Sequence, residues 1–221
     1  MALAVPFRKE ENLKRRALTL AILAILDARC VLAQAVDPVF SGPQIGEPLT
    51  PFMARGVYDA DAGKAIDLIA RANGKPVFLV FVHESNRPSI MVTRVLMNYA
   101  ARRAKDGLVA GAVWLADDAA STEQFLKRAR HALPEGVPIG ISVDGKEGPG
   151  AYGLNRKVTL TVLVGKENKV TANFALVQPS VQADVPKILA QVVKLIGGKV
   201  PPLEELNPPP KPATKGRMET K

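Results

Sequence analysis

The sequence predicts an α/β fold, in which a central mixed β-sheet carries helices on both of its faces. Two observations lead to this prediction. Short apolar runs alternate along the chain with segments whose apolar residues recur at helical spacing, and the last two runs are separated only by a short charged turn. Such alternation is typical of parallel strands connected through helices, and two runs joined by a short turn predict an antiparallel hairpin. Together they indicate one domain with three layers.

Five apolar runs of seven or eight residues are predicted to be strands. The first is a continuous run of valine, leucine and phenylalanine, which indicates a strand buried on both faces. The last two are predicted to pair as a hairpin across the turn 165–168. The predicted strands cover residues 76–82, 108–115, 138–144, 158–164 and 170–176.

Four segments carry apolar residues three and four positions apart and are predicted to be helices. Asn73 and Gly74 favour an end to the first of them. In the third, Ser121 and Gln124 have the spacing of a capping box, which places the helix start at Ser121. The predicted helices cover residues 59–72, 89–105, 121–133 and 181–196.

The N-terminal segment 1–35 has the order of a secretory signal peptide. A basic stretch precedes the mostly apolar run 17–26, and Ala33-Gln34-Ala35 follows. The sequence therefore predicts an exported protein, periplasmic or secreted, cleaved near Ala35; an amphipathic N-terminal helix of a cytosolic protein is the alternative. The apolar run makes a helix of about 15 Å, half of a bilayer core, so we expect no stable membrane span after cleavage.

The domain itself is predicted to cover residues 57–197. An extended lead-in rich in proline and glycine, 36–56, precedes it. From residue 198 onward prolines alternate with charged residues, and a segment of this composition cannot bury a core. We therefore expect 198–221 to be a disordered Pro/Lys-rich tail.

The net charge of +9 by itself suggests nucleic acid or an anionic membrane as a partner. The distribution of the charge argues against this. Residues 1–35 hold six basic and three acidic residues, so the net charge falls to +6 without them, and the other basic residues are spread along the chain. Aromatic residues, on which bases stack, make up only 5% of the chain. We expect a solvated basic surface and no nucleic-acid partner.

Cysteine and histidine are scarce in this chain. Cys30 is the one cysteine and lies in the predicted signal segment, so the rest of the chain has no thiolate nucleophile, no intramolecular disulfide and no cysteine ligand for a metal. No motif brings the two histidines, His83 and His131, together. The sequence therefore predicts no metal site and no cofactor.

The order of the predicted elements resembles the thioredoxin-like superfamily in its redoxin version, over about residues 57–197. In that family the first core strand leads into the dithiol loop Cys-x-x-Cys, often with proline before the second cysteine, and a long helix follows. Here the proline is present and both cysteines are replaced. The matching residues of the degenerate dithiol motif are Asn86, Arg87, Pro88 and Ser89.

Two further motifs carry the same resemblance. The stretch Ala-Tyr-Gly-Leu at 151–154 is similar to the Tyr-Gly-Val element that precedes the family's cis-proline. The position of that proline falls on Val158, where we expect a trans peptide bond, because a cis bond before a residue other than proline costs about 3 kcal/mol. The run 162–170 resembles the strand, charged turn and strand that close the family's sheet.

The resemblance implies a protein that is not a working thiol-disulfide oxidoreductase. Dithiol exchange needs one thiolate that attacks and a second thiol that releases the mixed disulfide, and the peroxidases of the superfamily also need a cysteine. Asn86 and Ser89 supply neither thiol. Both residue types can instead cap the first turn of a helix, so the redox site is expected to have become a structural cap, as in a pseudoenzyme.

The resemblance also implies a peptide-contact surface, because redox-active relatives pair the segment beside the cis-proline with the substrate backbone. We therefore expect a non-catalytic binding or structural module whose partner is another protein or peptide. Two alternatives stay open: an enzyme of a different class that uses the cluster of His83, Glu84 and Ser85, and a subunit whose redox cysteines come from a partner. A pocket that holds His83 with an acidic partner would favour the enzyme. The candidate binding residues are His83, Glu84, Ser85, Lys157 and Thr159.

Overall fold

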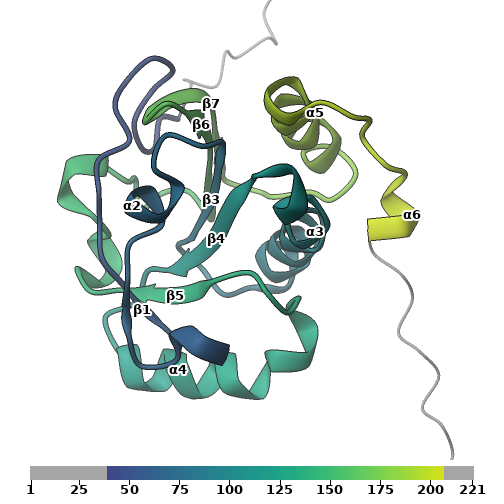
Figure 1. Cartoon of the computed structure of the whole chain (residues 1–221). Helices are drawn as coiled ribbons and strands as arrows, with labels where there is room; N and C mark the ends of the chain where they lie inside the picture. Colours follow the sequence, from purple (N-terminus) through teal and green to yellow (C-terminus); the bar gives the residue numbers. More distant parts are fainter. Residues whose placement is uncertain (1–38, 207–221) are drawn as a thin grey trace, which may run out of the picture. The chain divides into compact units, whose positions relative to one another are not determined.

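The structure, a computed structural model, describes residues 39–206 (Figure 1). The predicted signal segment, Cys30 and residues 207–221 of the predicted tail lie outside the described residues. In chain order the helices and strands are β1 (Ala54–Gly56), β2 (Ala65–Ile66), α2 (Leu68–Ala72), β3 (Val77–Val82), α3 (Arg87–Arg103), β4 (Val109–Trp114), α4 (Ala119–Arg128), β5 (Ile139–Ser142), β6 (Leu160–Lys166), β7 (Lys169–Leu176), α5 (Val185–Ile196) and α6 (Leu203–Leu206).

The strands form one mixed sheet of seven in the order β2-β1-β5-β4-β3-β6-β7. β3, β4 and β5 are parallel, whereas β6, β7, β1 and β2 are antiparallel to their neighbours. At the carboxyl end of β3, Val82 pairs with Trp114 of β4 and with Leu160 of β6. The loops that follow β3 and β4 therefore meet the start of β6 at one edge of the sheet.

Helices cover both faces of this sheet, and the resulting three layers confirm the predicted fold class (Figure 1). Leu96 of α3, Leu126 of α4 and Ile188 of α5 belong to one buried cluster on the first face. Leu68 of α2 belongs to the cluster on the second face. The six residues of β3 are all buried and alternate between the two clusters, as expected for a strand covered on both sides.

The segment before β1 covers the part of the second face that the short helix α2 leaves open. Its residues Leu49 and Phe52 are buried, and β1 itself pairs with β5 and β2. The Phe52 ring lies 5.5 Å from the Phe81 ring and 5.3 Å from the Tyr152 ring, measured between centroids. Leu49, Phe52 and β1, which belong to the predicted lead-in, are therefore part of the core and the sheet.

The prediction of a helix over 59–72 is wrong. The chain forms a 3-10 turn at Asp59–Asp61, then β2, and only then the five-residue helix α2. Ile66, which fits the helical spacing, pairs with Ala54 in the sheet. The helix begins after Asp67 because the carboxylate of this residue accepts hydrogen bonds from the N–H groups of Ile69 and Ala70, both at 2.9 Å.

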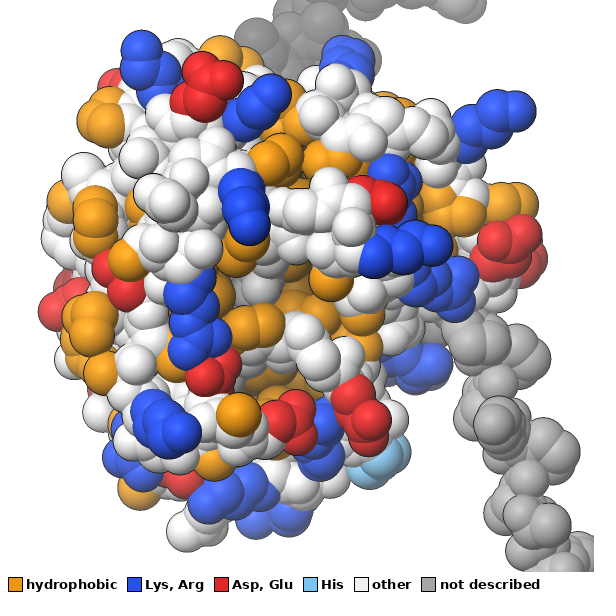
Figure 2. All heavy atoms as spheres, in the orientation of Figure 1, with side chains coloured by type: hydrophobic (Ala, Val, Ile, Leu, Met, Phe, Trp, Pro, Cys, Tyr) orange, Lys and Arg blue, Asp and Glu red, His pale blue; other side chains and the backbone are white. Residues whose placement is uncertain are grey.

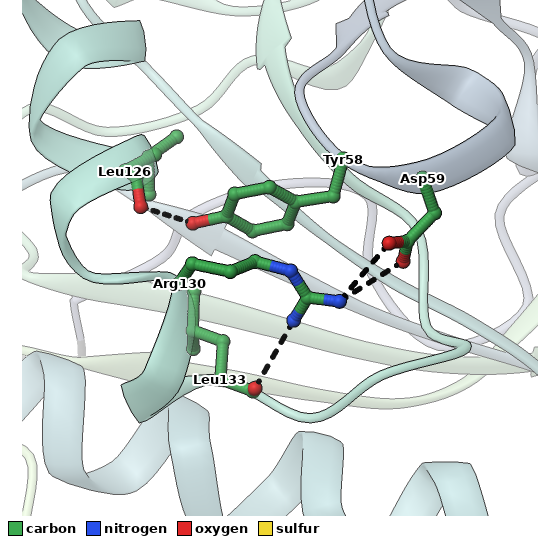
Figure 3. Close-up of polar contacts among 5 residues, drawn as sticks. All are labelled: Tyr58, Asp59, Leu126, Arg130 and Leu133. Atoms are coloured by element: carbon green, nitrogen blue, oxygen red, sulfur yellow. Dashed lines mark hydrogen bonds and ion pairs between the residues drawn. The ribbon is translucent and has the colours of Figure 1, made fainter.

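An arginine holds the turn at Asp59 against the end of α4 (Figure 3). Arg130 Nη2 lies 3.1 and 3.2 Å from the two carboxylate oxygens of Asp59, and Nη1 donates to the Leu133 carbonyl at 3.4 Å. The guanidinium also lies over the Tyr58 ring, 4.7 Å from its centroid, and the Tyr58 hydroxyl donates to the Leu126 carbonyl. Asp59 has a φ of 53°, which no helix residue adopts. These contacts favour a turn where the sequence predicted a helix.

The predicted start of α4 is also wrong, by two residues. Asp118 is the N-cap, and its carboxylate accepts a hydrogen bond from Ser121 N at 3.0 Å. Ser121 therefore receives the cap and does not provide it, so the predicted capping box with Gln124 does not form. Aspartate serves well here, because its charge also interacts favourably with the N-terminal end of the helix dipole.

The first part of the predicted disordered tail has a defined structure. Residues 197–206, which we call the strap, cross α3 and end in α6, where the Leu206 side chain is fully buried in the first cluster. The prediction for 198–206 is therefore wrong, because Leu206 reaches the core. Side chains of α3 hold the strap through three hydrogen bonds: Arg103 Nη2 to Gly197 O at 2.7 Å, Arg102 Nη2 to Glu205 O at 2.7 Å and Asn98 Nδ2 to Leu206 O at 3.2 Å.

Candidate functional site

Residues 83–89, which we call the loop 83–89, comprise the connection from β3 and the first residues of α3, at the end of the sheet where β3 and β4 end. The residues of the degenerate dithiol motif and the cluster proposed for an enzyme both lie on it. Two of its side chains, His83 and Ser89, are buried, and the residues between them are exposed. The buried pair fixes the shape of the loop, as the following contacts show.

Asn86 is the N-cap of α3 and forms a capping box with Ser89. Asn86 Oδ1 accepts a hydrogen bond from Ser89 N at 3.0 Å, and Ser89 Oγ accepts one from Asn86 N at 3.1 Å. Ser89 Oγ also lies 2.5 Å from Glu84 O and 2.8 Å from Asn86 O, so its single proton is donated to one of these carbonyls. Pro88 lies in the first turn, where its missing N–H costs no hydrogen bond. The prediction that this loop caps the helix is confirmed.

Removing the capping oxygen is expected to destabilise the domain. Asn86→Ala should lower the free energy of unfolding by about 1 kcal/mol, because Ser89 N loses its acceptor. Urea unfolding followed by circular dichroism measures the loss. Asn86→Asp is the matched control, since it keeps the acceptor and adds a favourable charge at the helix N-terminus. Equal stability of the alanine and aspartate variants would contradict the role of the cap.

The exposed residues Glu84 and Ser85 make contacts that lead away from His83. Ser85 Oγ accepts a hydrogen bond from Trp114 Nε1 at 3.1 Å, which joins the loop to the end of β4. The Glu84 carboxylate accepts one from Asn86 Nδ2 at 3.3 Å. No hydrogen bond between described side chains links His83 to either residue. The structure therefore does not bring the three residues of the predicted enzyme cluster together.

His83 lies in a buried polar network, with only 8% of its surface exposed. Its Nε2 lies 2.8 Å from Thr161 Oγ1 on β6, and Thr161 Oγ1 lies 2.5 Å from Ser41 Oγ. Ser41 Oγ in turn accepts a hydrogen bond from Asn155 N at 3.0 Å. Burial lowers the pKa of His83 to about 4, so its ring is neutral at pH 7. The network joins β3, β6 and the segment before β1.

The segment at the cis-proline position has its N–H groups occupied within the chain. Val158 is buried and the peptide bond before it is trans, like every other bond of the described residues. Lys157 N donates to Asn155 Oδ1 at 2.9 Å, Val158 N donates to Asn155 O at 3.2 Å, and Thr159 N donates to Leu176 O at 2.8 Å. An added peptide strand would find no free N–H on these three residues, although the Lys157 side chain is exposed.

An open pocket of about 360 Å³ lies beside the first turn of α3. Sequence reasoning did not find it, because its two walls come from segments far apart in the chain. The only local signal is an apolar residue, Met91, on the outer side of a helix. Most of the lining is apolar. Arg87, Pro88 and Met91 of α3 form one wall, and Pro179, Ser180, Val181 and Gln182, between β7 and α5, form the other.

Basic side chains do not gather over one element on the face that Figure 2 shows. Lysines and arginines lie there among acidic and apolar side chains. Several arginines are paired: Arg55 with Glu123 and Arg71 with Asp61, both at 2.6 Å. A nucleic acid would need a continuous basic patch, and this face does not provide one.

Within residues 39–206, no three or more histidine, cysteine, aspartate or glutamate side chains lie close enough together to hold a metal ion. None of the helices there has the length and apolar content needed to cross a membrane.

Comparison of the sequence with models of known protein families finds no match, and no curated protein matches it. Solved structures do match. A putative thiol:disulfide interchange protein, DsbE, from Chlorobium tepidum is 18% identical with a TM-score of 0.56, over 70% of this chain and 99% of the other. A putative protein disulfide isomerase from Bacteroides thetaiotaomicron is 14% identical with a TM-score of 0.56, over 72% and 96%. Peroxidoxin BcpB from Mycobacterium tuberculosis is 16% identical with a TM-score of 0.50, over 69% and 97%.

These likenesses concern the fold, since all three identities are low. They agree with the seven-stranded mixed sheet packed against helices. At the predicted positions of the dithiol the chain carries Asn86 and Ser89, and no described residue is a cysteine. The protein thus has the thioredoxin-like fold of the redoxins and lacks their cysteine pair.

Proposed function

We propose that this protein is a non-catalytic binding module that takes an apolar segment of another protein or a peptide into the pocket beside Pro88. One observation carries the proposal: the loop 83–89, which caps α3, lies next to an open pocket. Asn86 Oδ1 and Ser89 Oγ bind backbone groups of the loop and helix. The adjacent pocket is open and lined mostly by proline, methionine and valine side chains. Concave, mostly apolar sites of this size are where proteins ordinarily bind ligands.

The contacts of His83 favour this module over an enzyme built on the loop. A general base needs a neutral imidazole within reach of the group that it deprotonates, and a third group that orients the ring. The Nε2 atom of His83 is occupied by Thr161 in a buried network, and the side chains of Glu84 and Ser85 bind elsewhere. His83 is therefore buried and does not line the pocket, whereas Pro88 does.

Peptide display on the full chain tests the proposed binding. Enriched peptides should bind the wild type and bind at least about tenfold more weakly when Met91→Glu or Val181→Asp places a charge in the apolar pocket, a loss of about 1.4 kcal/mol. Ala120→Glu on the exposed side of α4 is the matched control and should bind as the wild type does. If the enriched peptides bind both pocket variants with the affinity of the wild type, the proposal is contradicted.

Redox activity is expected to be absent, because neither position of the dithiol loop carries a thiol. An insulin-reduction assay and a peroxide-consumption assay on residues 36–221 should both give the rate of the blank without protein. Thioredoxin under the same conditions is the positive control. A rate clearly above the blank would contradict this part of the proposal.

We also propose that the module acts outside the cytoplasm, since a basic stretch, an apolar run and Ala33-Gln34-Ala35 follow one another in segment 1–35. N-terminal sequencing of protein isolated from its native host should then begin at Val36. Protein that begins at Met1 or Ala2 in the soluble cytosol would contradict export.

A further inference from the structure

The strap 197–206 runs along α3 from the carboxyl end of the helix toward its amino end. In each of three hydrogen bonds a side chain of α3 donates to a carbonyl oxygen of the strap. Residue numbers rise along the strap while they fall along the helix, so the strap advances from the last turn of α3 toward its first turn and ends at Leu206 beside Asn98. The three pairs, in strap order, are Gly197 with Arg103, Glu205 with Arg102 and Leu206 with Asn98.

The pocket lies on the same face of α3 as the end of the strap. Residues three and four positions apart share one face of a helix, and Asn98, Arg94, Met91 and Arg87 have this spacing. Asn98 binds the strap, whereas Met91 and Arg87 line the pocket. At 1.5 Å per residue, Met91 is about 10 Å and Arg87 about 16 Å from Asn98 along the helix axis.

The sequence after Leu206 has the length and chemistry to reach and fill this pocket. It reads Asn-Pro-Pro-Pro-Lys-Pro over residues 207–212. A polyproline helix rises about 3.1 Å per residue, so five of these residues span about 15 Å, which matches the distance from Asn98 to Arg87. Proline rings are apolar, and a preformed polyproline helix loses little conformational entropy when it docks in a groove.

The carbonyl groups of such a segment also need donors, because a polyproline helix has no internal hydrogen bonds. On α3 the strap carbonyls already receive theirs from Arg103, Arg102 and Asn98. Arg94 and Arg87 are the next donor-bearing side chains along this face toward the amino end. The same kind of contact can therefore continue from the strap to the pocket.

We propose that residues 207–212 continue the strap and occupy the pocket beside Pro88, with Arg94 and Arg87 donating to their carbonyl oxygens. A segment tethered this closely has an effective concentration of the order of millimolar, so a partner must displace it before it can bind. The contact between the tail and the pocket does not depend on a binding partner. Its role in inhibition rests on the proposed function, that the pocket binds a peptide.

Oxidation of methionine tests the contact in the full chain, because peroxide converts an accessible methionine to its sulfoxide. Met91 lines the pocket, and Met53, exposed beside β1, serves as the internal reference. Replacing Pro208, Pro209 and Pro210 by glycine should raise the rate of oxidation of Met91 several-fold and leave the rate of oxidation of Met53 unchanged. Mass spectrometry of proteolytic peptides measures both rates. Equal rates at Met91 in the two chains would overturn the proposal.

A double-mutant comparison separates the arginine contact from a local effect of the substitution. Arg94→Ala should raise the rate at Met91 in the wild-type chain and should add little in the chain with three glycines. An equal increase in both chains would overturn the role of Arg94. If the rate at Met91 in the wild type rises on dilution, the occupant is the tail of a second copy, which overturns the contact within one chain.

Peptide binding separates this proposal from the proposed function. Peptides that bind through Met91 and Val181 should bind the chain with three glycines several-fold more tightly than the wild type, and equal affinities would contradict autoinhibition. The proposed function fails if neither chain binds a peptide through the pocket, and that result leaves the oxidation rates of Met91 unaffected. The tail contact is tested by the oxidation rates of Met91 alone, independently of peptide binding.

Discussion

Phe81→Ala is expected to lower the free energy of unfolding by about 3–5 kcal/mol, the usual cost of removing a fully buried phenylalanine. Phe81 lies on β3 with none of its surface exposed, and its ring contacts Phe52 and Tyr152, each at 5.5 Å between centroids. Alanine would leave a cavity between the sheet and the segment before β1. Chemical denaturation followed by circular dichroism measures the loss.

The same substitution at an exposed position is the control for Phe81. Phe40 is 62% exposed, so Phe40→Ala should change the free energy of unfolding little. Phe81→Leu refills part of the cavity and should lose substantially less than Phe81→Ala. If Phe81→Ala costs no more than Phe40→Ala, the aromatic cluster does not hold the second face of the sheet together.

Stability is expected to fall by about 3 kcal/mol between pH 6.5 and pH 4 because of His83 alone. Burial lowers the pKa of His83 to about 4 in the folded state, whereas the unfolded chain has the ordinary value of 6.5. Above pH 6.5 the ring is neutral in both states and its contribution is fully present. As the pH falls toward 4, only the unfolded state binds the proton, so unfolding becomes easier. Below pH 4 both states are protonated and the loss levels off.

Urea unfolding of wild type and His83→Gln across this pH range measures the effect. Glutamine does not titrate and can still form a hydrogen bond with Thr161, so the wild type should lose about 3 kcal/mol more than the variant between pH 6.5 and pH 4. The carboxylates titrate equally in both chains and cancel in the difference. Parallel profiles for wild type and His83→Gln would contradict the burial of this histidine.

The sequence predicts the central strands well because their pattern is local. The run at β3 is too short for a buried helix, is rich in valine and phenylalanine, and has all six residues buried in the structure. The hairpin of β6 and β7 follows from its short turn in the same way. The loop at Asn86 could also be predicted as a helix cap, since a capping box depends on neighbours within one turn.

The parts that the sequence does not predict depend on distant partners. Ile66 fits a helical pattern, but it lies in β2 because β1 is available to pair with it. Gly56 is close to Asp61 in a turn so tight that a Cβ atom at Gly56 would collide with the Asp61 backbone, and no spacing rule announces this contact. Leu206 ends a segment of disordered composition and is buried only because α3 receives it.

Some features of the candidate site can be predicted from the sequence, and others depend on distant partners. The absence of a thiol at Asn86 and Ser89 can be read directly from the sequence. The environment of His83 cannot, because Thr161 and Ser41 approach it from elsewhere in the chain. The pocket needs both α3 and the segment before α5, so Met91 has no visible role until the two walls are placed together.

The capping box of α3 also bears on how thiol chemistry could evolve at this loop. A cysteine at position 86 removes the carboxamide oxygen that Ser89 N requires, and a cysteine at position 89 removes the hydroxyl that accepts from Asn86 N. The loss of a capping residue costs about 1 kcal/mol, and one cysteine alone does not provide a dithiol. Each single replacement by cysteine is therefore expected to cost stability without supplying a dithiol, so thiol chemistry at this loop requires two changes that both weaken the cap.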